Sequence, residues 1–305
     1  MRIVSMLPGA TEVVYLLGLG DQLHGVSHEC DYPADARTKR VITRSPFDPH
    51  TLPSAEIDRL VRETGSEGRE LYHVDAQALA EIRPDLVLTQ GLCEVCAVPV
   101  LSVRVAMSER PAILSLDATS LEEVLLDIQR VADAAGVEER GKQVVGALRE
   151  RLETVRRSVG GLSRTRVTSL EWLDPLFNAG HWTPQMVALA GGEEVLSRPG
   201  APSRRIEWEE VRAARPDVLL LIPCGFGPQR SLQELPLLER LPGWKELPAV
   251  QHDQVWAADS NSYFSRPGPR LVDGVEMTAR MLHPRELGEP SPQAAVRALT
   301  GVIPR

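Results

Sequence analysis

Cysteine has the most reactive side chain in this sequence, and the chain of 305 residues contains four of them. Each cysteine follows a short apolar segment that we interpret as a buried strand. In open parallel α/β sheets, ligands bind beyond the carboxyl ends of the strands. The sequence therefore predicts that the four thiols converge on one cleft. They are Cys30, Cys93, Cys96 and Cys224.

Thiolate sulfur is a preferred ligand of zinc and of iron–sulfur clusters, so the four cysteines could form a metal site that His28 or His181 completes. They could also ligate the metal of a bound chelate, or stay free thiols that line the cleft. A redox role for the C-x-x-C pair is disfavoured, because such a pair needs a helix start and Pro99 follows too soon. In a metal-dependent enzyme, His181 or Glu171 would transfer the proton.

Aromatic residues make up only 4% of the chain, and most lie in predicted loops after strands or beside glycine and proline. Flat side chains bury a large area at low entropy cost and suit a large planar ligand. Packing beneath a connecting helix is the alternative for Trp172 and Phe177. The polar residues Gln90, Glu171 and His181 hold comparable positions and complete the candidate contacts. The aromatic candidates are Tyr32, Phe47, Trp172, Phe177, Trp182, Phe226, Tyr263 and Phe264.

Helix and strand patterns alternate along the chain, which predicts an α/β protein with mostly parallel sheets. One unit recurs, since residues 79–88 and 211–220 both read as a helix, an Arg-Pro-Asp turn and a buried strand. We interpret the recurrence as two Rossmann-like lobes, although helix, turn and strand also form a common connection. The apolar spacing over 138–159 predicts a helix of about 30 Å that joins the lobes.

These elements divide the chain into four parts. An N-terminal lobe covers residues 1–118, connecting helices cover 119–160, and a C-terminal lobe covers 161–285. The tail, 286–305, is rich in proline and then weakly helical. We expect this tail to pack on the outside of the protein.

Charge and hydropathy exclude two classes of partner. The chain carries 34 basic and 42 acidic residues, a net charge of −8, and no segment gathers Lys or Arg with aromatic residues, so we expect no nucleic-acid partner. No apolar run approaches the roughly 18 residues that a spanning helix needs, so we expect no membrane insertion. Pro8 and Gly9 interrupt the apolar start too early for a secretory signal. We expect a cytoplasmic protein, or a periplasmic or cell-surface one if a signal has been removed.

The sequence resembles the substrate-binding proteins of the ABC-transporter type that carry iron complexes and cobalamin. The resemblance covers about residues 2–283 and looks most like the vitamin B12-binding branch. It rests on the stretches 2–5 with 8–12, 16–21 with 25–26, 83–87, 186–194 and 263–267.

The resemblance implies the fold of class III periplasmic binding proteins, in which two lobes hold the ligand between them. It implies a binding function rather than catalysis, with cobalamin, a related corrinoid or another metal chelate as the ligand. Phe177 and Tyr263 would then face the corrin. The cysteine-rich stretches 28–33 and 92–98 resemble a cytosolic subgroup without a leader segment.

An ABC permease is the partner that the resemblance implies. Exported members of the class dock on the permease through one acidic residue of each lobe. Glu67 or Glu70 could serve in the N-terminal lobe, and Glu234 or Glu239 in the C-terminal lobe.

Overall fold

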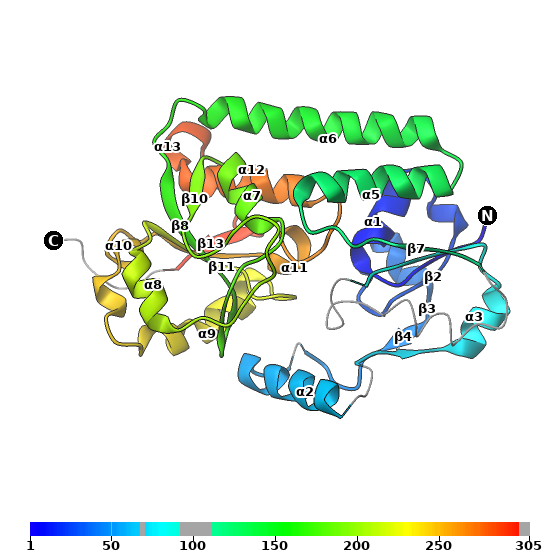
Figure 1. Cartoon of the computed structure of the whole chain (residues 1–305), viewed down its shortest axis with the longest axis horizontal. Coiled ribbons are helices and arrows are strands. Elements are labelled where there is room, and N and C mark those ends of the chain that lie inside the picture. Colours follow the sequence, from blue (N-terminus) through cyan, green and yellow to red (C-terminus); the bar gives the residue numbers. More distant parts are fainter. Residues whose placement is uncertain (50, 68–70, 92–110, 299–305) are drawn as a thin grey trace.

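The computed structural model describes residues 1–49, 51–67, 71–91 and 111–298, which form two α/β lobes side by side (Figure 1). The N-terminal lobe contains a parallel sheet in the order β3-β2-β1-β6-β7. Side chains alternate between its faces, so Ile3 and Leu88 join one hydrophobic cluster while Val4 and Val87 join another. Its strands are β1 (Ile3–Ser5), β2 (Leu23–Val26), β3 (Arg40–Val41), β6 (Leu86–Thr89) and β7 (Ala112–Ser115).

The C-terminal lobe contains a sheet in the order β10-β8-β11-β12-β13, with β9 pairing off that path to β8. Strands β10, β8, β11 and β12 are parallel, whereas β13 is antiparallel to β12 and β9 is antiparallel to β8. The sheets therefore confirm the predicted fold class of two mostly parallel α/β lobes. The strands are β8 (Thr165–Leu173), β9 (Leu176–Asn178), β10 (Gly192–Glu194), β11 (Val218–Leu221), β12 (Val255–Ala258) and β13 (Ala295–Arg297).

The tail differs from the sequence prediction, because residues 295–297 form a strand of the sheet and not a weak helix. Ala295 and Ala298 are buried, and both belong to hydrophobic clusters of the molecule. An edge strand exposes unpaired backbone groups. Pairing with β13 therefore covers the edge of β12. The local helix propensity of residues 295–297 does not reveal this pairing.

Helices flank both sheets. They are α1 (Pro8–Leu16), α3 (Ala76–Ile82), α7 (Thr183–Leu189), α8 (Trp208–Ala214), α9 (Pro228–Glu239), α10 (Pro248–Gln251), α11 (Ser260–Tyr263), α12 (Leu271–Leu282) and α13 (Pro284–Leu287). Short 3-10 turns cover Gly20–Gln22, Ala34–Thr38 and Trp244–Glu246. Among the residues with a described conformation, no helix combines the length and the apolar character that crossing a membrane requires.

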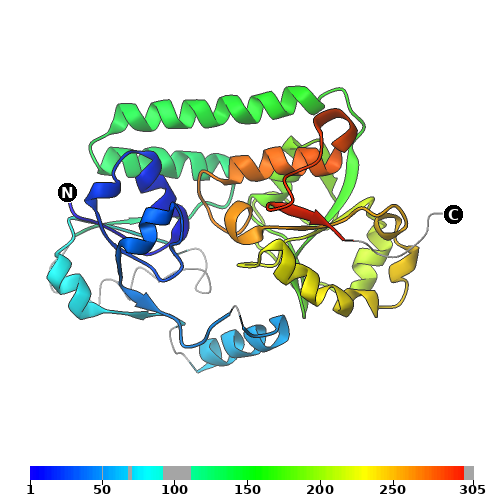
Figure 2. The same cartoon turned by 180° about the vertical axis from the view of Figure 1, so that it is seen from behind.

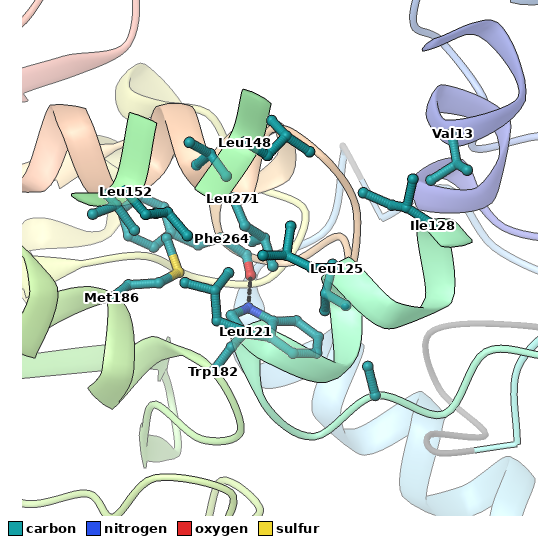
Figure 3. Packing of buried hydrophobic residues seen from close by; sticks show 14 of the residues in the cluster. Val13, Leu121, Leu125, Ile128, Leu148, Leu152, Trp182, Met186, Phe264 and Leu271 are labelled. Carbon is teal, nitrogen blue, oxygen red and sulfur yellow. Dashed lines mark hydrogen bonds between the residues drawn. The ribbon is translucent and has the colours of Figure 1, made fainter. Parts of the chain in front are cut away.

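Two helices join the lobes. Helix α5 (Leu121–Ala134) begins with the predicted capping box of Ser120 and Glu123, and α6 (Glu138–Val159) runs along both lobes (Figure 2). The range of α6 is the one that the apolar spacing predicts. Leu148 and Leu152 of α6 meet side chains of α5, α7 and α12 in one cluster that reaches into both lobes (Figure 3).

The two Arg-Pro-Asp turns have the same structure. Arg83 and Arg215 end α3 and α8 in the left-handed conformation, at φ 49° and 45°. Asp85 then accepts a hydrogen bond from the backbone N–H of Arg2 at 2.7 Å, and Asp217 accepts one from the N–H of Arg166 at 3.2 Å. Each aspartate thus ties a helix-to-strand turn to the start of the neighbouring strand.

One element stands outside the layers of the N-terminal lobe. Strands β4 (Thr43–Arg44) and β5 (His73–Val74) form a separate antiparallel pair, and α2 (Ser54–Ser66) lies in the chain between them. Both views place α2 on the side of the molecule opposite α6, beneath the space between the lobes (Figures 1 and 2).

Candidate ligand-binding cleft

A cavity of about 170 Å³ lies between the lobes, at the carboxyl ends of strands from both sheets. Pro8 and Gly9 after β1, and Gln90 after β6, reach it from the N-terminal lobe. Cys224 and Phe226, which follow β11, reach it from the C-terminal lobe. The positions agree with the general rule for ligand sites in parallel sheets.

Aromatic side chains form part of the wall of this cavity. Trp172 and Phe226 pack with ring centroids 5.3 Å apart, and Phe47 lines the cavity from the N-terminal lobe. The guanidinium of Arg230 lies 4.4 Å from the centre of the Phe226 ring, within cation–π distance. The wall therefore has flat aromatic surfaces, and the guanidinium of Arg230 packs on one of these rings.

A second cavity of about 80 Å³ shares Gln90, Cys224, Ser265 and Pro267 with the first, so the two adjoin each other. Glu171 and His181 line it. His181 lies in the turn before α7, as the sequence suggests. Glu171 and Trp172 were expected in a loop after the strand, but β8 continues to Leu173 and contains both.

His181 has the chemistry of a metal ligand in this second cavity. Its backbone adopts a left-handed conformation with φ 52°, held by a hydrogen bond from its N–H to the carbonyl of Ala201 at 2.7 Å. Burial lowers the pKa of the His181 imidazole below its usual value of 6.5. The ring is therefore neutral at pH 7, and neutral imidazole is the form that binds metals. Beside it, Glu171 accepts a hydrogen bond from the N–H of Gly180 at 3.1 Å.

The floor of the cleft is a tight junction of the two lobes. A Cβ atom added to Gly9 would lie 2.2 Å from the carbonyl oxygen of Pro267, so only glycine fits there. Arg266 is buried, lines the larger cavity, and donates to the carboxylate of Asp31 at 2.5 Å. Burial of Asp31 opposes ionisation, but Arg266 outweighs it and lowers the pKa of that carboxyl.

Cys30 and His28 lie beside the cleft and line neither cavity. The Cys30 sulfur accepts a hydrogen bond from Thr11 at 3.0 Å, and burial raises the pKa of its thiol. The Nδ1 atom of His28 lies 2.7 Å from the hydroxyl of Thr43, and its ring packs on Tyr72 at 5.3 Å. Burial lowers the pKa of His28, and the nearby negative charge of Glu29 opposes this shift without reversing it.

The other predicted aromatic contacts divide into two groups. Trp182 and Phe264 line the smaller cavity but are mostly buried, and the Trp182 indole N–H donates to the Phe264 carbonyl at 2.7 Å (Figure 3). Tyr32, Phe177 and Tyr263 line neither cavity. Tyr32 is 50% exposed and stacks instead on the guanidinium of Arg270.

Two of the four predicted cysteine ligands, Cys30 and Cys224, lie among the described residues. Cys93 and Cys96 lie outside the described residues. Among the residues that are described, no three His, Cys, Asp or Glu side chains come close enough to hold a metal ion together. The zinc or iron–sulfur hypothesis for Cys30, Cys224 and their C-x-x-C partners stays a prediction.

Several lining residues were not expected from the sequence. Ile57 and Val61 come from α2, and Arg266 and Asn261 follow β12. Arg266 lies inside the 263–267 stretch that carries the resemblance, so that stretch could have pointed to it. The apolar positions of α2 carry no such information, because they read as the inner face of an ordinary surface helix.

Residues 3–262 match the periplasmic binding protein family. This match covers most of the chain. The chain belongs to the periplasmic binding protein family.

Other members of the periplasmic binding protein family resemble the chain over most of its length. A vitamin B12-binding protein of Vibrio cholerae is 24% identical over 284 residues, covering 92% of this chain and 88% of that protein. An uncharacterized ABC transporter substrate-binding lipoprotein of Bacillus subtilis is 24% identical, with 93% and 80% covered. The chain is thus similar to these proteins over nearly its whole length.

Solved structures of the periplasmic binding protein family share this fold. A crystal structure of the periplasmic vitamin B12-binding protein of Vibrio cholerae has a TM-score of 0.67 at 23% identity, covering 92% of this chain and 96% of that one. The periplasmic heme-binding protein of Roseiflexus in apo form has a TM-score of 0.69 at 22% identity, covering 92% and 97%. The common fold is the two-lobed one described above.

Proposed function

We propose that the protein binds a planar metal chelate, with a corrinoid such as cobalamin as the leading candidate, in the cleft between its lobes. The observation that carries the proposal is the wall that Trp172 and Phe226 of the C-terminal lobe form in a cavity between the two lobes. Flat aromatic surfaces match a macrocycle in shape and bury much of its area. The relatives named for vitamin B12 and for heme support the same class of ligand.

The polar groups around that wall suit a chelate with charged or amide substituents. Gln90, Asn261 and Ser265 line the cavity, and amide and hydroxyl groups both donate and accept hydrogen bonds. His181 offers a neutral imidazole in the adjoining space. A chelate already fills most coordination positions of its metal, so one protein donor is enough to complete them. Delivery of the chelate to an ABC permease follows from the same proposal, since relatives of the chain are ABC substrate-binding proteins.

Native mass spectrometry of the purified protein tests the proposal first, because a corrin, a heme, a zinc ion and an iron–sulfur cluster differ greatly in mass. Absorbance titrations with cyanocobalamin and with hemin then measure affinity. Saturable binding of one chelate at a 1:1 ratio supports the proposal. Failure of both to bind, with zinc or a cluster found instead, would replace it by the metal-site hypothesis.

A further inference from the structure

An arm of the N-terminal lobe reaches across to the C-terminal lobe at the larger cavity. We call residues 51–66 the strap; it consists of α2 and the three residues before it. At its base, β4 and β5 pair through Thr43 with Val74 and Arg44 with His73. The strap lies opposite α6, which joins the lobes on the other side (Figure 1). The cleft is therefore bounded by a covalent connection on one side and by a docked segment on the other.

Three polar contacts hold the start of the strap on the C-terminal lobe. The backbone N–H of Ser54 donates to Oε1 of Glu234 at 2.9 Å, and Arg230 donates to the carbonyl of Leu52 at 2.9 Å. The indole N–H of Trp172 donates to the carbonyl of Ser54 at 3.2 Å. Arg230 and Glu234 also pair with each other at 2.7 Å. We call Trp172, Arg230 and Glu234 the latch.

Of the hydrophobic side chains of α2, Ile57 is the one that is buried. No side chain of α2 belongs to any of the three hydrophobic clusters formed by the described residues. The Ser54 hydroxyl and Oε2 of Glu234 are buried at the contact without a hydrogen-bond partner in the described part of the chain. Unsatisfied buried polar atoms cost free energy that water would return on opening. The docked strap is thus held by a few polar bonds and opposed by these atoms.

The docked strap also limits the size of the cavity. Ile57 and Val61 of α2 form part of its wall, opposite residues of the C-terminal lobe. The cavity of about 170 Å³ is smaller than the roughly 300–1,000 Å³ of ordinary small-molecule pockets. A chelate with a tetrapyrrole-type ring is among the larger ligands of such pockets. Movement of Ile57 and Val61 with the strap would widen the cavity on that side.

We propose that the strap is a movable cover of the cleft, which the latch holds on the C-terminal lobe and which must leave that lobe for a chelate to enter. The gating part of this inference rests on the proposed function, whereas opening of the strap does not. The base formed by β4 and β5 stays paired, and α2 moves as a unit. After entry, Ile57 and Val61 would cover the ligand face turned away from Trp172.

Hydrogen exchange read by mass spectrometry tests the opening of the strap without any ligand. The variant Glu234→Ala removes the acceptor of the Ser54 N–H and the partner of Arg230. We expect the amides of α2 to exchange ~10-fold faster than in wild type, while those of α3 in the same lobe do not change. The matched control is Glu63→Ala, which breaks an exposed ion pair with Arg59 inside α2 and leaves the latch intact. Equal exchange in the Glu234→Ala variant and the control overturns the proposal.

A second latch variant, Arg230→Gln, keeps the test decisive if Glu234→Ala does not fold. Stopped-flow mixing with hemin and with cyanocobalamin then measures gating. We expect faster association for both latch variants than for wild type and Glu63→Ala. Faster exchange with unchanged association would show that the strap opens but does not control entry. If neither chelate binds wild type, the proposed function fails, and the exchange data alone decide whether the latch holds the strap.

Discussion

Arg270 of the C-terminal lobe and Glu12 of the N-terminal lobe form a two-point ion pair at the junction of the lobes, at 2.9 and 2.5 Å. The Glu12 side chain is only 2% exposed, and Arg266 lies 3.7 Å from the same carboxylate. Burial raises the pKa of Glu12 although the two arginines oppose the shift. Because a buried carboxylate depends on its cations, this pair couples the position of one lobe to the other.

Replacement of Arg270 should therefore destabilise the protein strongly. In Arg270→Ala, the buried carboxylate of Glu12 keeps only its more distant partner, Arg266. We expect a loss of about 3–5 kcal/mol in the free energy of unfolding. Urea denaturation measures it. Arg40→Ala is the control, since Arg40 pairs with Glu81 at an exposed site and its loss should stay below about 1 kcal/mol. Similar losses in the two variants would contradict a structural role for the junction pair.

Two glycine-to-alanine substitutions should change the stability of the protein in opposite directions. In Gly9→Ala, the new methyl group meets the Pro267 carbonyl, which is backbone and cannot turn away, so we expect a loss of about 1–3 kcal/mol. Gly146 lies exposed within α6 with open space around its Cα, so Gly146→Ala should stabilise by about 0.5–1 kcal/mol. Thermal unfolding of both variants measures the difference. A neutral Gly9→Ala would mean that the lobes separate easily at this contact.

The fold could be predicted because its elements carry local patterns. The apolar spacing of α6 and the capping box at Ser120 are set within a few residues, and so are the helix ends at Arg83 and Arg215. Strand ends also locate the cleft, since Gln90 and Cys224 line it after β6 and β11. In these cases the deciding interactions lie close together in the sequence or follow from the geometry of parallel sheets.

The strap could not be predicted, because its position depends on contacts between distant residues. The bond from Ser54 to Glu234 joins positions 180 residues apart, and each residue alone reads as an ordinary helix residue. Glu234 illustrates the same limit. The sequence suggests an exposed carboxylate that could meet a permease, whereas the structure buries it against Arg230 and the strap. Burial by tertiary packing overrides what residue type alone indicates.

Glu194 in β10 should make stability depend on pH. Its carboxylate accepts hydrogen bonds from the N–H groups of Ser169 and Leu196, yet burial outweighs them and raises its pKa to about 7. Because that pKa lies above the usual 4.5, folding favours the protonated acid. The stabilisation is therefore complete below pH ~4.5 and is lost as the pH rises through about 7.

The melting temperature of wild type relative to Glu194→Gln should consequently fall between pH 4.5 and 7, because glutamine does not titrate. Glu193→Gln is the matched control on the neighbouring exposed residue and should follow wild type. Differential scanning calorimetry across this range measures the three curves. Parallel curves for wild type and Glu194→Gln would show that the carboxyl ionises alike in the folded and unfolded chain.

Paired phenylalanine variants should show which aromatic surface meets the ligand. Phe226 lines the larger cavity beside Trp172, whereas Phe177 lies in β9, lines neither cavity and forms a backbone bridge with Arg205. Phe226→Leu and Phe177→Leu each replace a phenyl ring by the same side chain, so their effects on affinity can be compared directly. We expect chelate affinity to fall about tenfold in Phe226→Leu, since a buried aromatic contact is worth roughly that much, and to stay unchanged in Phe177→Leu.

The opposite result would be equally informative, because family resemblance points to Phe177 as a residue that faces the corrin. If titration shows weaker binding only in Phe177→Leu, the ligand lies along β9 and not in the cavity beside Phe226. The strap would then cover an empty cleft, and its latch variants should leave association rates unchanged. The two phenylalanine variants therefore test the location of the ligand independently of its identity, for whichever chelate binds.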